Sequence, residues 1–213
     1  MTSTLSLYRR KQIFTTLASA LPSPQSELTY QDPFQLLIAV ILSAQATDKA
    51  VNQVTQTLFT LAPNAQTLYA LGDEKICPII QRLGLYRAKS RNIWRTAGLL
   101  LERHNGQVPA DRAALEALPG VGRKTAGVVL NVAFGQPTIA VDTHVFRVSK
   151  RLGLATGNTP DVVEQELLKS VPKHFKQNAH HWLILHGRYV CKARTPLCSQ
   201  CSINPWCQSA PSE

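Results

Sequence analysis

The sequence predicts an all-α protein, and three observations lead to this prediction. Apolar residues recur every three to four positions along most of the chain, as in the series Val51, Val54, Leu58 and Leu61. Residues typical of helix starts and stops flank these segments. The run "PFQLLIAVILSAQ" (33–45) is apolar on every side, which suits a helix buried in the middle of a bundle. Only "TIAVDTHVFRV" (138–148) alternates enough to fit a strand as well.

The first helix is expected within residues 1–20. The apolar side chains available for its buried flank are Leu7, Ile13, Phe14 and Leu17. The same segment is rich in Ser, Thr and Arg and has no acidic residue before Glu27, so a transit peptide is the alternative interpretation. We favour the helix, because its apolar spacing continues directly into the rest of the chain.

Residues typical of helix starts and stops predict the ends of further helices. Asp73 is expected to cap one helix, and Asn105-Gly106 to end another. Thr159 followed by Pro160 marks a third start, since proline is favoured at the first helical position. The segment "FGQPT" (134–138) places a glycine and a proline between two periodic stretches, so we expect a link between two lobes there.

The composition points to a globular protein with a polyanionic partner. The 213 residues are 44% hydrophobic and 17% charged, and 23 Lys and Arg against 13 Asp and Glu give a net charge of +10. Such an excess of positive charge favours binding to nucleic acid. The longest apolar run, residues 34–42, is about half of the roughly 20 residues that a membrane span requires. No secretory signal is evident, so we expect a cytoplasmic protein without a membrane partner.

The segment "DRAALEALPGVGRKTAGVVLNVAFG" (111–135) predicts a helix–hairpin–helix motif over about residues 111–134. Asp111 would cap the first helix, "PGVG" would form the turn, and the second helix would begin at Arg123. We expect Gly120 and Gly122 to adopt backbone angles that side chains forbid. The N–H groups of the turn would then converge on a phosphate at a helix N-terminus. The expected DNA contacts of this motif are Gly120, Val121, Gly122 and Arg123.

Lys124 and Asp142 are the candidate reactive residues. Lys124 follows Arg123 in the first turn of the second helix, where the positive helix end and the adjacent cation both disfavour an ammonium. A neutral amine is a nucleophile towards carbonyl-like carbon, yet a lysine here also suits a phosphate, and the residues alone leave both roles open. Asp142, in "AVDTHVFR" (140–147), is expected to cap the next helix while exposing an oxygen to a reaction centre.

A cysteine cluster lies at residues 191–207. Its spacing is C-x6-C-x2-C-x5-C, formed by Cys191, Cys198, Cys201 and Cys207. Four thiolates in one short loop can bind a tetrahedral zinc or a [4Fe–4S] cluster. Structural zinc usually joins two close pairs, and only one close pair exists here, so the spacing favours iron–sulfur over zinc. Lys192 and Arg194 between the first two cysteines are either a phosphate-binding finger or a solvated pair of charges.

Five motifs occur along the chain in this order: "ILSAQATD" (41–48), "GLYRAK" (84–89), "LPGVGRKTA" (118–126), "AVDTHVFR" and the four cysteines. In these motifs the chain resembles the endonuclease III family of helix–hairpin–helix DNA glycosylases. The resemblance runs from about residue 5 to the last cysteine. It implies a monomeric two-lobe enzyme, with a six-helix bundle at residues 26–136 and a cluster lobe made of residues 1–25 and 137–213. Double-stranded DNA with damaged bases or abasic sites would bind in the cleft between the lobes.

The same resemblance implies roles for single residues. Lys124 would be the Schiff-base nucleophile, Asp142 its essential carboxylate, and the four cysteines the ligands of a [4Fe–4S] cluster. Gln45 and Leu85 would fill the gap left by an extruded base. The backbone carbonyls of Leu118 and Val121 would hold a monovalent cation.

One residue departs from the family pattern. Gly127 stands where the family commonly has asparagine, which costs on the order of 1 kcal/mol inside a helix and leaves the base preference open. The expected activity is removal of oxidised pyrimidines followed by β-elimination at the abasic site. The alternatives are a monofunctional mismatch glycosylase of the same superfamily, whose members generally lack lysine at position 124, and a non-catalytic iron–sulfur DNA-binding protein, which needs neither Lys124 nor Asp142.

Overall fold

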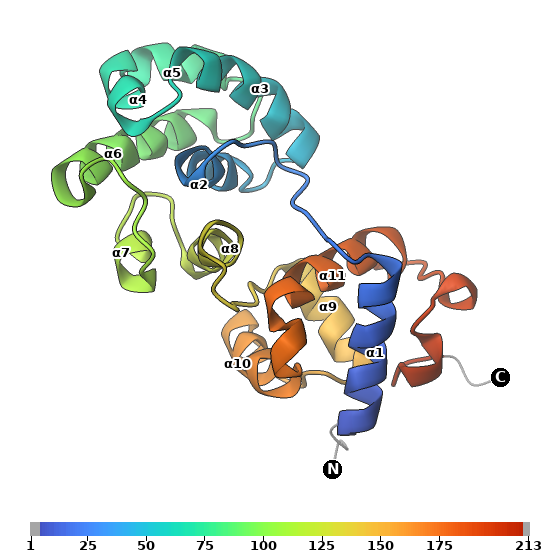
Figure 1. Cartoon of the computed structure of the whole chain (residues 1–213). Coiled ribbons are helices and arrows are strands. Elements are labelled where there is room, and N and C mark those ends of the chain that lie inside the picture. Colours follow the sequence, from blue (N-terminus) through green and yellow to red (C-terminus); the bar gives the residue numbers. More distant parts are fainter. Residues whose placement is uncertain (1–4, 211–213) are drawn as a thin grey trace. The chain divides into compact units, whose positions relative to one another are not determined.

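The computed structural model describes residues 5–210, and within that range the secondary structure is entirely helical (Figure 1). The prediction of an all-α fold is confirmed. The chain divides into two compact units. One is Ser26–Gly135; the other combines Met1–Gln25 with Gln136–Glu213, of which residues 1–4 and 211–213 lie outside the described part.

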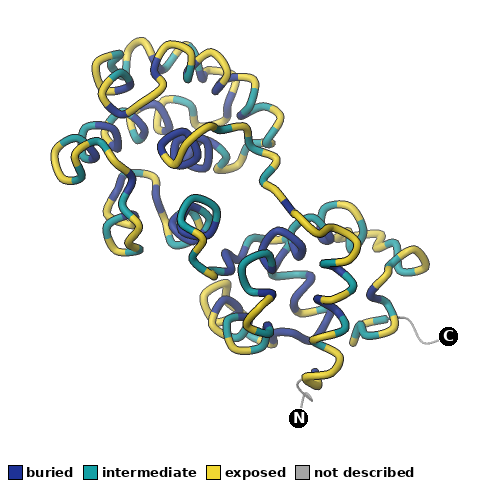
Figure 2. The backbone as a smooth tube through the Cα atoms, viewed as in Figure 1, coloured by how far each residue is buried: buried dark blue, intermediate teal, exposed yellow. Residues whose placement is uncertain are grey.

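The unit Ser26–Gly135 is built around one fully buried helix. Its helices are α2 (Pro33–Leu42), α3 (Asp48–Leu61), α4 (Ala65–Leu71), α5 (Asp73–Ile79), α6 (Tyr86–His104), α7 (Arg112–Glu116) and α8 (Arg123–Phe134). Every residue of α2 after Pro33 is buried, as its all-round apolar sequence predicts (Figure 2). The helices α3, α6 and α8 pack against α2, so this one helix positions the elements that carry the hairpin.

The second unit joins the N-terminal helix to the C-terminal part of the chain. It contains α1 (Leu7–Ala20), α9 (Thr143–Leu152), α10 (Pro160–Ser170), η1 (Lys173–Phe175), α11 (Lys176–Tyr189), η2 (Cys198–Gln200) and η3 (Asn204–Trp206). Phe14 of α1 stacks on Phe175 at 5.8 Å between ring centroids. The indole Nε1 of Trp182 donates to the carbonyl of Leu21 at 2.8 Å. Residues 7–20 therefore belong to the folded core, as the helix interpretation predicts.

The sequence predicts most helix ends correctly. Asp111 caps α7, Thr159 caps α10, and Asn105 and Gly106 end α6 with positive φ angles. The prediction for Asp73 is wrong, because Gly72 is the N-cap residue of α5 and the Asp73 carboxylate instead accepts from the hydroxyl of Ser90.

Leu7 differs from expectation, whereas Leu61 and the segment 138–148 agree with the all-α prediction. Leu7, expected on the buried flank of α1, is 67% exposed at the first residue of the helix, and Leu61, the last residue of α3, is 55% exposed. In the segment 138–148, residues 138–142 belong to neither a helix nor a strand, and α9 begins at Thr143. The alternation there reflects the buried residues Ile139, Ala140 and Val141 leading into that helix. No helix within residues 5–210 combines the length and the apolarity needed to cross a bilayer.

Candidate functional site

The turn between α7 and α8 is held in place by α2 and α6. Gly120 has φ +78°, and a Cβ at this position would lie 3.0 Å from Asn92 Nδ2 and 3.1 Å from Ile41 Cγ2. Only glycine combines this backbone angle with so close an approach. The buried hydroxyl of Thr96 donates to the carbonyl of Pro119 at 3.0 Å. The hairpin is therefore anchored to the core of its unit.

Gly122 differs from its predicted role. Its φ and ψ are −94° and 178°, an extended conformation that any residue adopts, so the expectation of special backbone angles is wrong for this glycine. The reason is that Gly122 is the N-cap residue of α8, and N-cap residues are normally extended. It has no side chain to accept from the first-turn N–H groups, and the space beyond its Cα is open. No side chain at the N-cap position competes with an anion for the N–H groups of this first turn.

Lys124 is exposed on the first turn of α8. Its neighbour Arg123 is half-buried, and the carbonyl of Arg123 accepts from Nη1 of Arg112 at 3.5 Å. Arg112 in turn pairs with Glu116 at 3.6 Å, so the base of the hairpin is braced from α7. The amine of Lys124 is thus presented to solvent on a fixed backbone.

A second lysine provides a contrast. Lys89, from the motif "GLYRAK", is only 4% exposed, and its Nζ has no hydrogen-bond partner within residues 5–210. Burial lowers the pKa of Lys89. A low pKa suits a nucleophile, but a buried amine does not reach a sugar, so accessibility favours Lys124 as the reactive lysine.

Asp142 lies in the other unit, at the start of α9. Its Oδ1 accepts from the backbone N–H of Val145 at 2.8 Å, which confirms the predicted cap. Its second oxygen makes no hydrogen bond within the described part of the chain, and the side chain is half-buried. Two residues earlier, the carbonyl of Ala140 lies 2.8 Å from Nδ1 of the buried His180 on α11. The backbone leading to Asp142 is therefore fixed by α11, while one carboxylate oxygen stays available.

Gln45 and Leu85 share an unusual backbone conformation. Both lie in the left-handed region, with φ of 55° and 59°, although neither is glycine. Both are exposed, Leu85 to 60%. Their loops are neighbours, since a Cβ on Gly84 would lie 4.0 Å from the carbonyl oxygen of Gln45. Left-handed conformations of such residues cost about 1–2 kcal/mol and persist where the surrounding structure imposes them, commonly at functional sites.

The four cysteines line one cavity of about 150 Å³. None of them forms a disulfide, and no group of three or more His, Cys, Asp or Glu in residues 5–210 converges closely enough to hold a single metal ion. A zinc ion needs its sulfur ligands about 2.3 Å away, around one point. A cavity that is several times the size of a water site, with thiols around its wall, fits a larger multi-atom group.

Electrostatics at this cavity favour a positively charged occupant. Burial raises the pKa of the Cys201 and Cys207 thiols, and Cys191 and Cys198 add to the effect in both cases. Four clustered thiolates are therefore unfavourable unless a cation compensates them, which is how binding of a metal releases protons. His186 lines the same cavity, with Nε2 3.6 Å from the sulfur of Cys201, and burial lowers the pKa of His186 to about 4.

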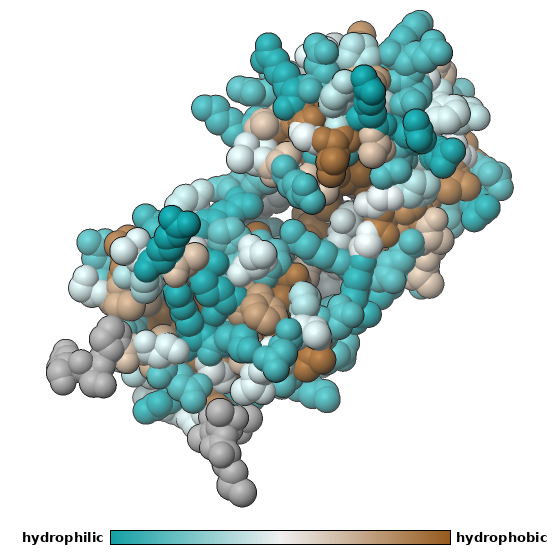
Figure 3. All heavy atoms as spheres, turned by 180° about the vertical axis from the view of Figure 1, so that it is seen from behind, coloured by the Kyte–Doolittle hydropathy of each residue, from teal (hydrophilic) through white to brown (hydrophobic). Residues whose placement is uncertain are grey.

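Lys192 and Arg194 are exposed on the loop between the first two cysteines. Hydrophilic side chains dominate the face of the molecule drawn in Figure 3, and its apolar patches are scattered.

The residues that hold the loop between Cys191 and Cys198 were not identified from the sequence. Arg147 donates to the carbonyl of Cys191 at 3.1 Å, and Arg151 contacts the loop at several points. Their i,i+4 spacing on α9 was the available signal, because it places both side chains on one face.

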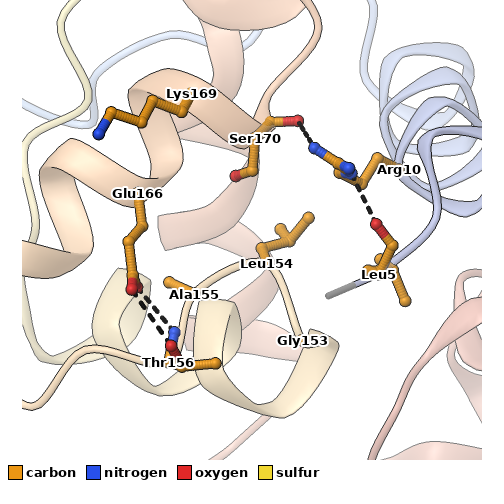
Figure 4. Close-up of a pocket in the computed structure, with 9 residues that line it drawn as sticks. All are labelled: Leu5, Arg10, Gly153, Leu154, Ala155, Thr156, Glu166, Lys169 and Ser170. Atoms are coloured by element: carbon orange, nitrogen blue, oxygen red, sulfur yellow. Dashed lines mark hydrogen bonds between the residues drawn. The ribbon is translucent and has the colours of Figure 1, made fainter. Parts of the chain in front are cut away.

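Another cavity of the same unit contains none of the predicted site residues. It measures about 240 Å³ and is lined by residues of α1, of α10 and of the segment after α9 (Figure 4). Two of its charged residues, Arg10 and Glu166, are held by hydrogen bonds to the backbone. Arg10 donates to the carbonyls of Leu5 and Ser170, and the carboxylate of Glu166 accepts from the backbone of Thr156 and Gly157. These bonds tie α1 and the loop after α9 to α10, which is a structural role.

Comparison with known proteins places the chain in a family. Residues 38–173 match the HhH-GPD superfamily of base excision DNA repair proteins. Endonuclease III of Escherichia coli K12 is 55% identical over 200 residues, which cover 94% of this chain and 95% of the relative. Endonuclease III of Haemophilus influenzae is 54% identical over the same shares.

Solved structures agree with this result. The structure of a trapped endonuclease III–DNA covalent intermediate superposes with a TM-score of 0.90 at 44% identity, covering 97% of both chains. A thermostable thymine-DNA glycosylase, 23% identical, shares the fold with a TM-score of 0.84 over 95% of this chain and 97% of its own. The chain therefore belongs to the endonuclease III family of the HhH-GPD superfamily of base excision DNA repair proteins.

Proposed function

We propose that this chain removes oxidised pyrimidines from double-stranded DNA in the cytoplasm and then cleaves the abasic site, with Lys124 as the nucleophile. The observation that carries the proposal is the exposed amine of Lys124 on the uncapped first turn of α8. The N–H groups of that turn provide a site for a DNA phosphate, so the amine would stand beside a bound sugar–phosphate backbone. Gly120, Val121, Gly122 and Arg123 would make the backbone contacts.

The reaction begins with extrusion of the damaged base, which pairs and stacks poorly and therefore costs less to flip than a sound one. The Lys124 amine forms a bond to C1′ as the bond from C1′ to the base breaks, and the base leaves with the electron pair and gains a proton. Asp142 stabilises the cationic sugar and accepts a proton from the amine. The sugar opens to an imine, loss of the C2′ proton expels the 3′ phosphate, and water hydrolyses the imine to release Lys124.

Two exposed loops would hold the opened duplex. Gln45 and Leu85 would occupy the gap that the extruded base leaves, and their left-handed backbones support this role because strain of this kind is kept where function requires it. The carbonyls of Leu118 and Val121 are proposed to hold a monovalent cation in the hairpin. The Leu118 carbonyl accepts one bond, from the N–H of Val121 at 3.1 Å, and retains a second lone pair for a cation.

The four cysteines are proposed to ligate a [4Fe–4S] cluster. Their shared cavity of about 150 Å³ supports a multi-atom group of this kind, and the spacing of the four cysteines favours it over a zinc ion. When bound, the cluster would fasten residues 191–207 into one shape. Lys192 and Arg194 would then project from a rigid loop as phosphate contacts.

Lys124→Arg and Lys124→Ala distinguish a nucleophile from a phosphate contact. Borohydride reduces an imine between enzyme and abasic DNA to a stable covalent adduct. Arginine keeps the charge but is not a nucleophile, so K124R should bind abasic duplex nearly as tightly as the wild type and form no adduct. The alanine variant should lose the adduct and bind more weakly. An adduct formed by K124R or K124A at the wild-type rate contradicts the assignment.

A monofunctional glycosylase, the closest alternative, is not favoured, because such an enzyme has no use for a nucleophilic amine at this position. A gel that compares abasic, thymine-glycol and mismatched duplexes separates the two. Strand cleavage of the abasic duplex by the wild-type enzyme is the expected result. Base removal from a mismatch without strand cleavage supports the alternative.

A further inference from the structure

One arginine of α9 contacts both ends of the cysteine loop. Nη1 of Arg151 donates to the sulfur of Cys191 at 3.4 Å and to the carbonyl of Lys192 at 2.7 Å, and Nη2 donates to the carbonyl of Ala193 at 2.8 Å. The backbone carbonyl of Arg151 accepts from the thiol of Cys207 at 3.5 Å. The first and the last cysteine, sixteen positions apart in the sequence, thus both contact one residue, and the Cys207 contact is one that only the protonated thiol makes.

The positions of the three acceptors on residues 191–193 suit a guanidinium group and do not suit a lysine amine. The planar fork of the guanidinium carries five donors in fixed directions, and three separate acceptors on residues 191–193 are met at once. A lysine amine has three donors at one point and does not span acceptors that lie on three successive residues. The side chain of Arg151 is half-buried on the wall of the cysteine cavity. Its charge therefore acts close to the sulfur of Cys191.

The position of Arg151 along α9 is itself fixed. Gly153 ends the helix with φ +79°, and a Cβ there would come within contact distance of the Gln208 side chain, so the chain after Cys207 lies directly against this helix end. The N–H of Ser209 donates to the Arg151 carbonyl at 3.0 Å. At the other end of α9, nine residues and roughly 14 Å away along the helix axis, stands Asp142.

We propose that Arg151 is the positioning residue of the cysteine loop: it retains the cluster, raises the cluster's reduction potential and fixes Lys192 and Arg194 for phosphate contact. The inference rests on the proposed presence of the cluster. A charged hydrogen bond to a ligand sulfur stabilises the more negative, reduced state, so its removal lowers the potential. Partners of this kind, which hold the ligands of a metal site, typically change metal affinity 10- to 100-fold when removed.

The test uses the whole protein with its cluster and three variants. Arg151→Met removes the fork and the charge, and Arg151→Lys keeps the charge but not the fork. Lys150→Met is the matched control, since Lys150 is exposed on the same turn of α9 and bonds to Asn158 rather than to the loop. The measurements are iron content, the rate of iron loss to a chelator followed by visible absorbance, and the reduction potential by voltammetry.

We expect R151M to lose iron at least tenfold faster than the wild type and to have a lower potential. R151K should lose iron at an intermediate rate, and K150M should match the wild type in both measurements. If R151M fails to fold, as judged by circular dichroism, the R151K variant carries the test. Wild-type behaviour of the folded Arg151 variants overturns the inference and leaves the cluster assignment intact. A wild-type protein that contains no iron overturns the cluster assignment, and the inference with it.

A double-mutant cycle tests the link to DNA. If Arg151 acts on binding by holding Arg194, then Arg194→Ala should weaken binding to an undamaged duplex less in the R151M background than in the wild type. Additive effects of the two substitutions contradict the positioning of Arg194, because independent contacts add.

Discussion

Gly187→Ala tests how closely α9 must be held against α11. A Cβ on Gly187 would lie 2.9 Å from Cβ of His144 and 3.1 Å from Cγ2 of Val148. Favourable carbon–carbon contacts begin near 3.5 Å, so the two helices must separate by about 0.6 Å. His144 is two residues after Asp142, and the carbonyl of Gly187 accepts from Arg147 at 2.8 Å. The displacement therefore falls on the turn that positions the Asp142 carboxylate.

The expected loss in the free energy of unfolding differs in size from the expected loss in the rate of base removal. Alanine gains about 1 kcal/mol over glycine in a helix, whereas overpacking of a core costs about 1–3 kcal/mol. The net loss in the free energy of unfolding is thus roughly 0–2 kcal/mol. A displacement of 1 Å in a catalytic group costs about 100-fold in rate, so 0.6 Å should cost on the order of tenfold, which corresponds to about 1.4 kcal/mol of transition-state stabilisation.

Urea unfolding and single-turnover base removal measure the two effects. Gly98→Ala is the control, because it places the same methyl group in a helix but against the exposed ring of Tyr69, in the unit that does not contain Asp142. We expect G98A to keep full activity. A G187A variant that is about 1 kcal/mol more stable than the wild type and equally active would refute the reasoning.

Three further predictions follow from single residues. Leu85→Gly should stabilise the fold by about 0.5–1 kcal/mol in urea, because it relieves a left-handed leucine, and should weaken binding to abasic duplex; a loss of stability contradicts this. Arg194→Ala should reduce the slope of log Kobs against log salt by about 0.9, and an unchanged slope rules out a phosphate contact. Burial lowers the pKa of His181, so the folded state binds fewer protons than the unfolded one below about pH 6.5, and stability should fall as the pH drops. His181→Gln should flatten this dependence, and an unaltered pH profile contradicts the assignment.

Local signals explain what the sequence predicted well. Asp111, Asp142 and Thr159 each cap a helix through a bond to a backbone N–H three residues ahead, so their roles depend only on neighbouring residues. Asp73 looked the same in sequence, but its carboxylate bonds to Ser90, seventeen residues away. A partner at that distance is set by the packing of α5 on α6, which the local pattern does not contain.

The residues with positive φ angles also show that local sequence does not determine every backbone conformation. Propensity assigns positive φ to glycine, and this holds for Gly120 but not for Gly122. Gln45 and Leu85 adopt it against their propensity. Their conformations come from how two loops meet in the folded unit, so the resemblance to the family indicated these residues as candidates without indicating the strain.

The helix α9 has one role that the sequence predicts, at Asp142, and one that it does not predict, at Arg151. Its first turn is specified locally, by Asp142 capping Val145, and the sequence therefore indicated an exposed carboxylate there. Its last turn acts through Arg151 on a sulfur forty positions ahead, a contact that only the folded chain creates. Because a helix is rigid, a displacement of the cysteine loop at Arg151 would also move Asp142, whose carboxylate we propose to be catalytic. If this displacement occurs, R151M should slow single-turnover base removal even at saturating enzyme, and a defect confined to binding would exclude it.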